Sequence, residues 1–418
     1  MENNITINNR IPQLRFPGFT GEWQEKPLSH FLHEHKTKSD GKCEVHSVSV
    51  TKGVINQVEY LGRSFAASDT SKYNLAKPGD IIYTKSPTGA FPYGIVKQNK
   101  NPYNVIVSPL YAVYTPVNQY VGYILDSYFE SSVNTNNYLS SLIQKGAKNT
   151  IQISNDTFVS KSMCLPSDPA EQQKIAECLE ALDSLIVAES KELESLKAHK
   201  KGLMQQLFPQ PGATTPALRF PGFTGEWQEK KLNEVFSRVT RKNAENNQNV
   251  LTISAQYGLI SQLEFFKKSV ASSDVTGYYL LHKGEFAYNK SSSQGRPVGA
   301  IKPLRLYDKG VVSTLYTCFK CNNPEEIDFW EQYFDAGILD SEILSIAQEG
   351  ARNHGLLNIS TGDFFGLNVI LPTSPEMKKI AECLSSFDDV ITAAENELDS
   401  LKAHKKGLMQ QLFPQLQK

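Results

Sequence analysis

The 418-residue chain lacks the features that mark several large classes of protein. It has no run of 18 or more apolar residues, so we expect no transmembrane helix and no membrane partner. The opening residues MENNITINNRIP do not show the basic-then-apolar pattern of a secretory signal. Six cysteines are few for a chain of this length, which is typical of reduced thiols. Together these absences predict a cytoplasmic protein.

Sequence motifs for cofactors and catalysis are also missing. Neither a GxGxxG dinucleotide cradle nor a GxxxxGKS/T phosphate loop occurs in either half of the chain. The segment Asn101-Pro-Tyr103 lacks the second proline of an Asn-Pro-Pro-Tyr methyltransferase motif. No Ser/His/Asp arrangement stands in a recognisable local context. We therefore expect that the chain is not an enzyme and carries no cofactor.

Two small clusters have residue types that can bind metal. Cys318 and Cys321 form a CxxC without a second pair, so we expect two buried or partly buried thiols rather than a zinc site. The histidines His30, His33 and His35 have no counterpart in the second half. We interpret them as a partly exposed polar cluster and predict no metal site.

Neither sign of charge is in excess. The chain has 43 Lys and Arg against 44 Asp and Glu, a net charge of -1. Residues 1–168 hold 16 basic and 13 acidic side chains, a net charge of +3. Such a body does not attract nucleic acid as a whole. Any DNA-binding surface must be a local patch or be completed by a partner protein.

The chain contains much of itself twice. LRFPGFTGEWQEK begins at Leu14 and returns unchanged at Leu218, and SLKAHKKGLMQQLFPQ begins at Ser195 and returns at Ser400. The offsets are 204 and 205 residues, so the protein consists of two half-length units. Between these blocks the halves differ at most positions. Identical blocks must meet identical partners or each other, whereas divergent parts can meet different targets.

A long amphipathic helix is predicted near the end of each half. Apolar residues alternate spacings of four and three over more than four heptads, and only Glu189, Lys200 and Lys405 interrupt the seams with charge. Asp168-Pro169 and Ser374-Pro375 predict the helix starts, and Phe208-Pro209 and Phe413-Pro414 predict the stops. The seam residues are Ile175, Leu179, Leu182, Ile186, Leu193, Leu196, Leu203, Leu207, Ile380, Leu384, Phe387, Ile391, Leu398, Leu401, Leu408 and Leu412.

The two helices can supply each other's partner stripe. The short linker 209–217 starts the second globular unit near the end of the first helix, which favours an antiparallel coiled coil. The alternative is that each helix packs only on its own globular unit. Full overlap would place Lys405 opposite Leu182, whereas a one-heptad slip would place it opposite Glu189; we favour full overlap because it buries more apolar seam.

Two details of the helices add further expectations. We expect Lys200 and Lys405 to reach solvent along their flexible stems. Gly202 and Gly407 cost about 1 kcal/mol each relative to Ala within a helix. A glycine repeated at this place predicts the close approach of another backbone.

The segments 1–168 and 212–373 have short strand-like runs separated by turn residues. Matched strands are predicted at 80–84 and 285–289 and again at 105–111 and 311–316. Helical stretches are predicted near 119–145 and 325–349. Each segment is interpreted as a mixed α/β globular domain, separated from the other by a long antiparallel two-helix coiled coil. The expected division is 1–168, 169–211, 212–373 and 374–418.

This organisation resembles the specificity subunit of Type I restriction–modification systems. The resemblance covers the whole chain and depends on the LKAHKKGLMQQLF helix ends, the helix starts PAEQQKIAECL and PEMKKIAECL, and the two FPGFTGEW openings. GARNHGLLNISTGDF and GAKNTIQISNDTF also look like a late target-domain motif of that family.

The resemblance implies a function for each part. Two target recognition domains would each read one half of a split, asymmetric site on double-stranded DNA. The helices would act as a spacer for a gap of about 5–8 base pairs and dock two modification subunits. Restriction subunits would join this core, and S-adenosylmethionine, ATP and Mg would belong to the partner subunits.

Polar loops after matched strands are the candidate DNA contacts. Lysine and arginine would mostly hold phosphates, whereas serine, asparagine, glutamine and arginine can also read base edges. The candidates are Lys52, Lys85, Ser86, Thr88, Lys148, Asn149, Gln256, Tyr257, Lys290, Ser291, Ser292, Gln294, Arg296, Arg352 and Asn353.

Two other classes of function stay open at this point. One is a non-catalytic tandem-repeat adaptor that binds two proteins through its globular units. The other is a self-sufficient nuclease or methyltransferase, which the missing motifs disfavour. A salt-dependent shift of duplex DNA would separate a DNA-binding subunit from an adaptor.

Overall fold

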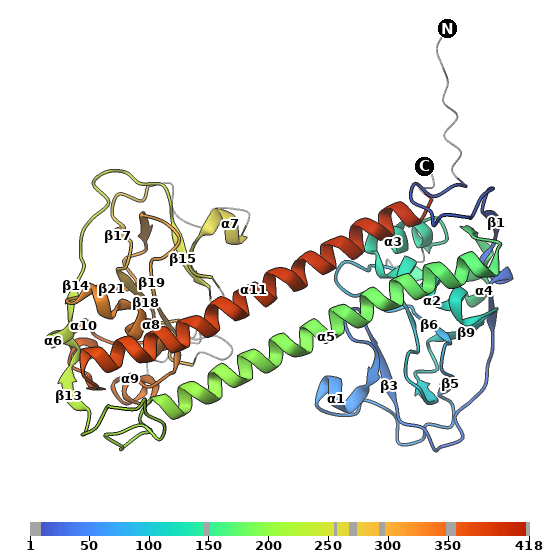
Figure 1. Ribbon diagram of the computed structural model, residues 1–418. Helices are drawn as coiled ribbons and strands as arrows, with labels where there is room; N and C mark the ends of the chain where they lie inside the picture. The colour runs from blue at the N-terminus through green and yellow to red at the C-terminus, as the bar shows by residue number, and fades with distance from the viewer. Residues whose placement is uncertain are drawn as a thin grey trace, which may run out of the picture. The chain divides into compact units, whose positions relative to one another are not determined.

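The computed structural model describes residues 10–145, 151–254, 257–266, 274–291, 297–347 and 357–414. The chain forms two compact units, one made of Met1–Ser190 with Asn396–Lys418 and the other of Lys191–Glu395. Each unit combines a globular portion with the start of one long helix and the end of the other (Figure 1). The predicted mixed α/β class is confirmed.

The first unit is built around a four-stranded antiparallel sheet in the order β2-β9-β6-β7. The strands β6 and β7 are buried along their whole length, and α2 packs against β7 and β9. The sheet consists of β2 (Leu32–Glu34), β6 (Ile81–Thr84), β7 (Ile95–Gln98) and β9 (Ala112–Pro116). Smaller strand pairs are β1 (Gln24–Pro27) with β12 (Ser162–Leu165), β3 (His46–Ser49) with β4 (Gly53–Asn56), β5 (Asn74–Ala76) with β8 (Val105–Val107), and β10 (Gln144–Lys145) with β11 (Ile151–Gln152). The helices are η1 (Leu28–His30), α1 (Gln57–Leu61), α2 (Gln119–Glu130), α3 (Ser132–Ser140), α4 (Asn155–Ser160) and the start of α5 (Pro169–Leu207).

The second unit repeats this plan with the sheet order β14-β21-β18-β19. The sheet consists of β14 (Phe236–Arg238), β18 (Phe286–Asn289), β19 (Ala300–Pro303) and β21 (Thr317–Cys321). Smaller pairs are β13 (Gln228–Lys231) with β22 (Asn368–Leu371), β15 (Leu251–Ser254) with β16 (Gly258–Ser261), and β17 (Tyr279–His282) with β20 (Lys309–Val312). The helices are α6 (Leu232–Val235), α7 (Gln262–Phe266), η3 (Pro324–Glu326), α8 (Ile327–Asp335), α9 (Asp340–Ile346), α10 (Thr361–Phe365) and the start of α11 (Ser374–Leu412).

The predicted strands and helices are confirmed in type, but two strands differ in extent: β8 ends at Val107 rather than at 111, and β20 ends at Val312 rather than at 316. The predicted strand at 80–84 is β6, and its counterpart at 285–289 is β18. The predicted helical stretches each divide into two helices, α2 with α3 and α8 with α9. No helix in the part of the chain that the structure describes is long and apolar enough to cross a bilayer.

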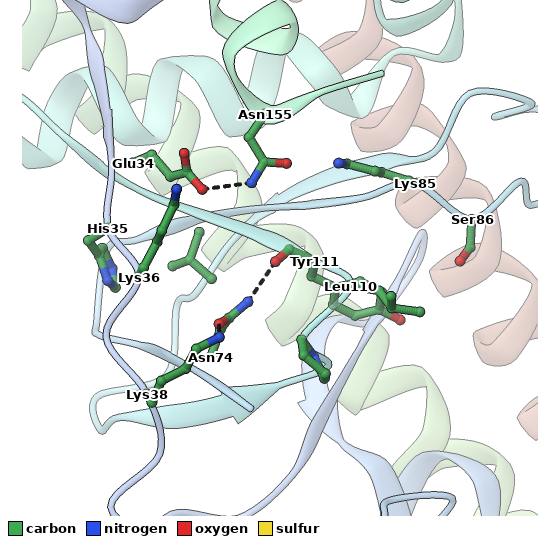
Figure 2. A pocket seen from close by; sticks show the side chains of 12 residues that line it. Glu34, His35, Lys36, Lys38, Asn74, Lys85, Ser86, Leu110, Tyr111 and Asn155 are labelled. Carbon is green, nitrogen blue, oxygen red and sulfur yellow. Dashed lines mark hydrogen bonds between the residues drawn. The ribbon is translucent and has the colours of Figure 1, made fainter. Parts of the chain in front are cut away.

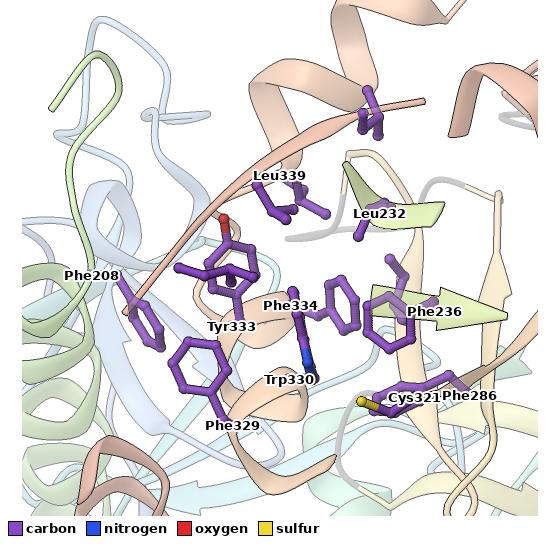
Figure 3. Close-up of a cluster of buried hydrophobic side chains, with 14 of the residues drawn as sticks. Phe208, Leu232, Phe236, Phe286, Cys321, Phe329, Trp330, Tyr333, Phe334 and Leu339 are labelled. Carbon is purple, nitrogen blue, oxygen red and sulfur yellow. The ribbon is translucent and has the colours of Figure 1, made fainter. Parts of the chain in front are cut away.

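The end of each long helix is buried in the unit that contains the start of the other helix. Leu207 and Phe208, at the end of α5, belong to the core of the second unit, where Phe208 faces Phe329 and Tyr333 (Figure 3). Leu412 and Phe413 enter the core of the first unit in the same way. Each aromatic in such a core contributes about 3–5 kcal/mol, judged from Phe→Ala substitutions. Internal packing therefore explains much of the identity of the two LMQQLFP blocks.

Within each unit the two helices run antiparallel, as predicted. In the first unit Lys405 of α11 forms an ion pair with Asp183 of α5 at 2.5 Å, and in the second unit Lys200 of α5 pairs with Asp388 of α11 at 2.5 Å. Both contacts match full overlap. Asp183 is next to Leu182, the residue that full overlap places opposite Lys405, whereas the slipped register would place Lys405 opposite Glu189. All predicted seam residues are buried or half-buried. The alternative that each helix packs on its own globular portion is also partly right, since Ile175 and Leu179 belong to the core of the first unit.

The expectation that the seam lysines reach solvent is wrong. The Lys405 side chain is 7% exposed and also contacts Glu130 of α2 at 2.6 Å. The Lys200 side chain is 11% exposed. Both ammonium groups pair instead with acidic residues beside the seam.

Within each unit, no close approach accompanies the two repeated glycines. A Cβ atom built at Gly202 or Gly407 would meet nothing within 4 Å, so no backbone in the described part of the chain approaches them. The second helix begins one residue early, at Ser374, because the Thr373 carbonyl already accepts the amide of Met377. The first begins at Pro169 as predicted, with the Asp168 carboxylate accepting from the Ala170 amide.

Candidate nucleic-acid interface

The strongest candidate loops follow equivalent buried strands in the two globular portions. Lys85 and Ser86 follow β6, and Lys290 and Ser291 follow β18. The strands hold their hairpins in the same way, since the Tyr83 hydroxyl donates to the Tyr93 carbonyl at 2.9 Å and its counterpart Tyr288 donates to Val298 at 2.7 Å.

Matched glycines close these hairpins. Gly94 and Gly299 have φ angles of 101° and 85°, and a Cβ atom at either would collide with the carbonyl oxygen of Thr84 or Asn289. Only glycine permits both the left-handed backbone and this close approach. The loops that carry the candidate lysines are therefore anchored at their base.

In the first unit the Lys85 loop borders a pocket of about 510 Å³ (Figure 2). We name it the lysine pocket, after the three lysines Lys36, Lys38 and Lys85 that line it together with one carboxylate, that of Glu34. His35 also lines it and pairs with the buried Asp80 at 2.9 Å. The remaining lining residues are Asn74, Ser86, Pro109, Leu110, Tyr111, Val113 and Asn155. The cluster of cations makes the lysine pocket a local positive patch on a chain of balanced charge.

Hydrogen bonds hold the polar groups of the lysine pocket in place. The Lys38 ammonium donates to the Asn74 side chain at 2.6 Å, and the Asn74 amide donates to the Tyr111 carbonyl at 2.8 Å. The Asn155 amide donates to the Glu34 carboxylate at 2.6 Å. Burial lowers the pKa of Lys85, and the nearby Glu34 charge opposes that shift. Positive groups that are positioned in advance lose less entropy when they meet an anion.

An exposed leucine marks the rim of the lysine pocket. Leu110 lies in the turn after β8 and is 78% exposed, and Leu315 is 64% exposed at the same place in the second globular portion. The two positions are 205 residues apart, the offset of the internal repeat. An apolar side chain beside cations suits a surface that meets bases as well as phosphates.

The second globular portion carries a similar set of cations. Lys290 is half-buried, burial lowers its pKa, and its ammonium donates to the Ile359 carbonyl at 3.4 Å. Lys242 donates to the Gly277 carbonyl at 2.8 Å. Lys38 makes the equivalent contact with the Lys72 carbonyl at 3.2 Å in the first unit. Both globular portions thus carry lysines at these equivalent positions.

The other described candidates lie on hairpin turns outside the lysine pocket. Lys52 is exposed between β3 and β4, and Tyr257 is 51% exposed between β15 and β16. Thr88 is exposed at the tip of the β6–β7 hairpin, where its backbone pairs with Phe91. Eight candidates lie outside the described residues: Lys148, Asn149, Gln256, Ser292, Gln294, Arg296, Arg352 and Asn353.

Sequence reasoning missed Glu34, Lys36, Lys38, Asn74 and Asn155. They come from separate places in the chain, and pairing of β2 with β9 and of β5 with β8 brings them together. One signal was available, because a basic segment follows the equivalent edge strand in both halves, HKTK in the first and TRK in the second. An alignment of the two halves at that strand would have indicated it.

The two cysteines of the CxxC are separated by the sheet. Cys318 packs in one buried cluster and Cys321 in another, on opposite faces of β21, so they cannot bind one ion. Burial raises the pKa of Cys318 to about 12 and that of Cys321 to about 11. The prediction of two buried thiols is confirmed. The histidines have separate surroundings, since His30 contacts Lys26 at 3.2 Å while His35 pairs with Asp80.

A solved structure shares this fold over nearly the full chain, and two further structures are less similar. The S subunit of a Type I restriction–modification system from M. genitalium is similar over 97% of this chain and 100% of its own, with a TM-score of 0.57 and 13% identity. The HsdS subunit from Thermoanaerobacter tengcongensis covers 96% of this chain and 97% of its own, with a TM-score of 0.39 and 14% identity. A structure described for complex assembly in the type I R-M system covers 96% and 97%, with a TM-score of 0.49 and 15% identity.

The first of these similarities establishes the fold, with its two globular portions and two long helices. No protein-family model and no curated protein sequence matches the chain.

Proposed function

We propose that this chain is the DNA-specificity subunit of a Type I restriction–modification complex and is itself non-catalytic. Residues 1–168 and 212–373 act as two target recognition domains, here called the first and second heads. The observation that carries this proposal is one fold present twice, with lysine loops at equivalent places and different side chains around them. Two such heads can recognise two different short sequences. The fold shared with the M. genitalium S subunit supports the same function.

The lysine pocket explains how a chain of net charge -1 can bind DNA. Lysines that neutralise phosphates release condensed counterions, which supplies affinity without sequence preference. Each head contributes only a few phosphate contacts. Binding should therefore weaken as the salt concentration rises, and tight binding should depend on both heads engaging one duplex.

The helices 169–211 and 374–418 would set the distance between the half-sites. Each observed helix has 39 residues, which corresponds to about 58 Å at 1.5 Å per residue. The ion pairs of Lys200 and Lys405 oppose sliding of one helix along the other. A register that cannot slide gives a fixed gap, which we place at about 5–8 base pairs.

Two copies of a modification subunit would dock on the outward faces of the helix ends. The identical KKGLMQQL blocks leave Lys201 and Lys406 exposed, and the space beside Gly202 and Gly407 is open to another backbone. Two identical surfaces suit two identical partners. Those partners would supply S-adenosylmethionine chemistry, and restriction subunits would add ATP- and Mg-dependent activity.

Genome-wide mapping of modified bases in the source cell, with and without this chain, tests the function. We expect one bipartite, asymmetric motif whose methylation disappears when the chain is deleted and returns when it is restored. If all methylation motifs persist without the chain, and the chain with its partners does not shift duplex DNA, the adaptor function would replace this proposal. Methylation by the purified chain alone would show an enzyme instead.

A further inference from the structure

Glu34 and Arg238 occupy the same place in the two heads. Glu34 ends β2 opposite Tyr114, which in turn pairs with Ile81 of β6. Arg238 ends β14 opposite Phe319, which pairs with Phe286 of β18. The central strands correspond with an offset of 205 residues, so the pairing register makes the two positions equivalent. At this one place the heads present opposite charges.

In the first head this position faces the lysine pocket. The Glu34 carboxylate lies beside Asn155 at the start of α4, and Lys85 points toward the same asparagine (Figure 2). One carboxylate oxygen, Oε1, accepts from the Asn155 amide at 2.6 Å. A carboxylate has about four acceptor sites, so Oε2 can accept a further hydrogen bond from a molecule in the pocket.

Folding does not require a carboxylate at this position. The equivalent of α4 in the second head is α10, which begins at Thr361 and is capped by the Ser360 hydroxyl accepting from the Asp363 amide. That helix forms with Arg238, an exposed residue, at the matching strand end. A carboxylate among lysines also repels phosphate, which is unfavourable on a DNA-binding surface unless it serves recognition.

The two side chains have complementary base preferences. A carboxylate accepts from the N4 amino group of cytosine in the major groove, whereas an arginine guanidinium donates two hydrogen bonds to O6 and N7 of guanine. Lys36, Lys38 and Lys85 surround Glu34 and would offset its repulsion from the phosphates. The differing charge at one shared position is therefore a means for heads of one fold to read different bases.

Resting on the DNA-reading function proposed above, we infer that Glu34 and Arg238 are matched specificity-determining residues. Glu34 reads the amino group of a cytosine in the first half-site. Arg238 reads a guanine at the equivalent step of the second half-site. Exchange of either side chain changes one base position of one half-site and leaves the other half-site unchanged.

The test uses the complete complex, expressed in its source cell with the wild-type or a variant chain, and maps methylated sites genome-wide. Glu34→Gln keeps an acceptor for Asn155 but changes the base-facing group to an amide, which pairs with adenine. We expect one position of the first half-site to change from cytosine toward adenine. The preference between the two bases should shift by roughly 5- to 150-fold, the range of one good side chain-to-base contact.

Arg238→Ala tests the second head independently, because the Arg238 side chain is exposed and its loss should not impair folding. At one position of the second half-site, the preference for guanine over the other bases should fall by a similar factor. The matched control is His33→Ala, since His33 is the strand neighbour of Glu34 and points to the opposite face of the sheet. That variant should leave both half-sites unchanged.

The outcomes separate the inference from the function on which it rests. A wild-type bipartite motif that stays unchanged in both Glu34→Gln and Arg238→Ala overturns the inference and leaves the proposed function intact. A wild-type complex without any bipartite motif overturns both. A shift in the same base position with His33→Ala would show that perturbation of β2, rather than base contact, is responsible.

Discussion

At the scale of single residues, one ion pair holds each head to the start of a long helix. The Arg15 guanidinium donates two hydrogen bonds of 2.7 Å to Glu171, whose side chain is 1% exposed, and the Trp23 indole donates to the same carboxylate at 3.2 Å. Arg219 and Glu376 repeat the pair in the second unit. Bonding to these carboxylates raises the pKa of both arginines. The identical openings are thus explained by contacts inside each unit.

The buried carboxylate gives the first prediction. Glu171→Ala removes the carboxylate that pairs with Arg15 and accepts from Trp23, so the free energy of unfolding of the first unit should fall by about 3–5 kcal/mol. Urea denaturation followed by circular dichroism measures the loss. The exposed Glu180→Ala in the same helix should change stability by less than about 0.5 kcal/mol. Equal losses in the two variants would contradict a specific role of the ion pair.

At the scale of elements, polar side chains gathered around one buried lysine, here called the polar node, fasten the helix pair to each head. In the first unit Lys405 of α11 contacts Asp183 of α5 and Glu130 of α2, and the Tyr123 hydroxyl of α2 donates to Asp183 at 2.5 Å. In the second unit Gln332 of α8 donates to Asp388 at 2.8 Å beside Lys200. A polar group buried in an apolar seam favours the one register in which it finds its partners.

The node predicts a pH dependence of folding in the first unit. Burial alone would raise the pKa of Asp183, but bonds from Lys405 and Tyr123 outweigh it and lower that pKa below 3.8. Burial would lower the pKa of Lys405, but Glu130 and Asp183 raise it above 10.5. The carboxylate's contribution is therefore present above about pH 4 and is lost as pH falls through its folded pKa. The lysine's contribution is present below its unfolded value and is lost as pH rises through its folded pKa.

Lys405→Met tests the node directly. It leaves Asp183 without its buried cation, so we expect a loss of about 3–5 kcal/mol at pH 7 and a weaker acid dependence than in the wild type. Denaturation curves at several pH values measure both effects. The double variant Lys405→Met with Asp183→Leu should recover part of the loss, because the partly buried Asp183 charge is gone and the Glu130 carboxylate, whose side chain is 45% exposed, can be hydrated. A single variant as stable as the wild type would show that the ion pair does not stabilise the unit.

At the scale of the whole molecule, the chain contains two copies of one fold, and each compact unit combines segments from both halves of the sequence. The first unit takes its globular portion from one half and the end of a helix from the other, and the second unit does the reverse. The amide of Leu14 bonds to the Gln411 carbonyl at 3.0 Å, and Leu218 bonds to Gln206 at 2.9 Å. Each opening block thus contacts the end of the helix from the opposite half. This exchange makes the helices a structural part of both heads.

Removal of one heptad from both helices tests the proposed spacer. Deletion of residues 188–194 and 393–399 removes segments that face each other in the observed register and spares both polar nodes. The helices shorten by about 10.5 Å. We expect the unread gap of the methylated site to shorten by about 3 base pairs while both half-sites stay the same. Methylation mapping measures the gap, and an unchanged gap would refute the spacer function.

The fold could be predicted largely because its signals are local or repeated. Heptad spacing, helix stops at Phe208-Pro209 and Phe413-Pro414, and matched strands before Lys85 and Lys290 are properties of neighbouring residues, and the structure confirms them. The register followed from the same pattern, because only full overlap buries the whole apolar seam. Duplication strengthened each prediction by providing every element twice.

Other features were decided only by tertiary packing. Lys405 looked like a solvated seam residue, yet its ammonium meets Glu130, which is 275 positions away in the chain. Glu34 and Asn155 are 121 positions apart, and the folded sheet and α4 place them together in the lysine pocket. Periodicity shows which face of an element is buried, but not which distant side chain will meet it. That depends on strand order and helix crossing, which the whole set of packing contacts determines.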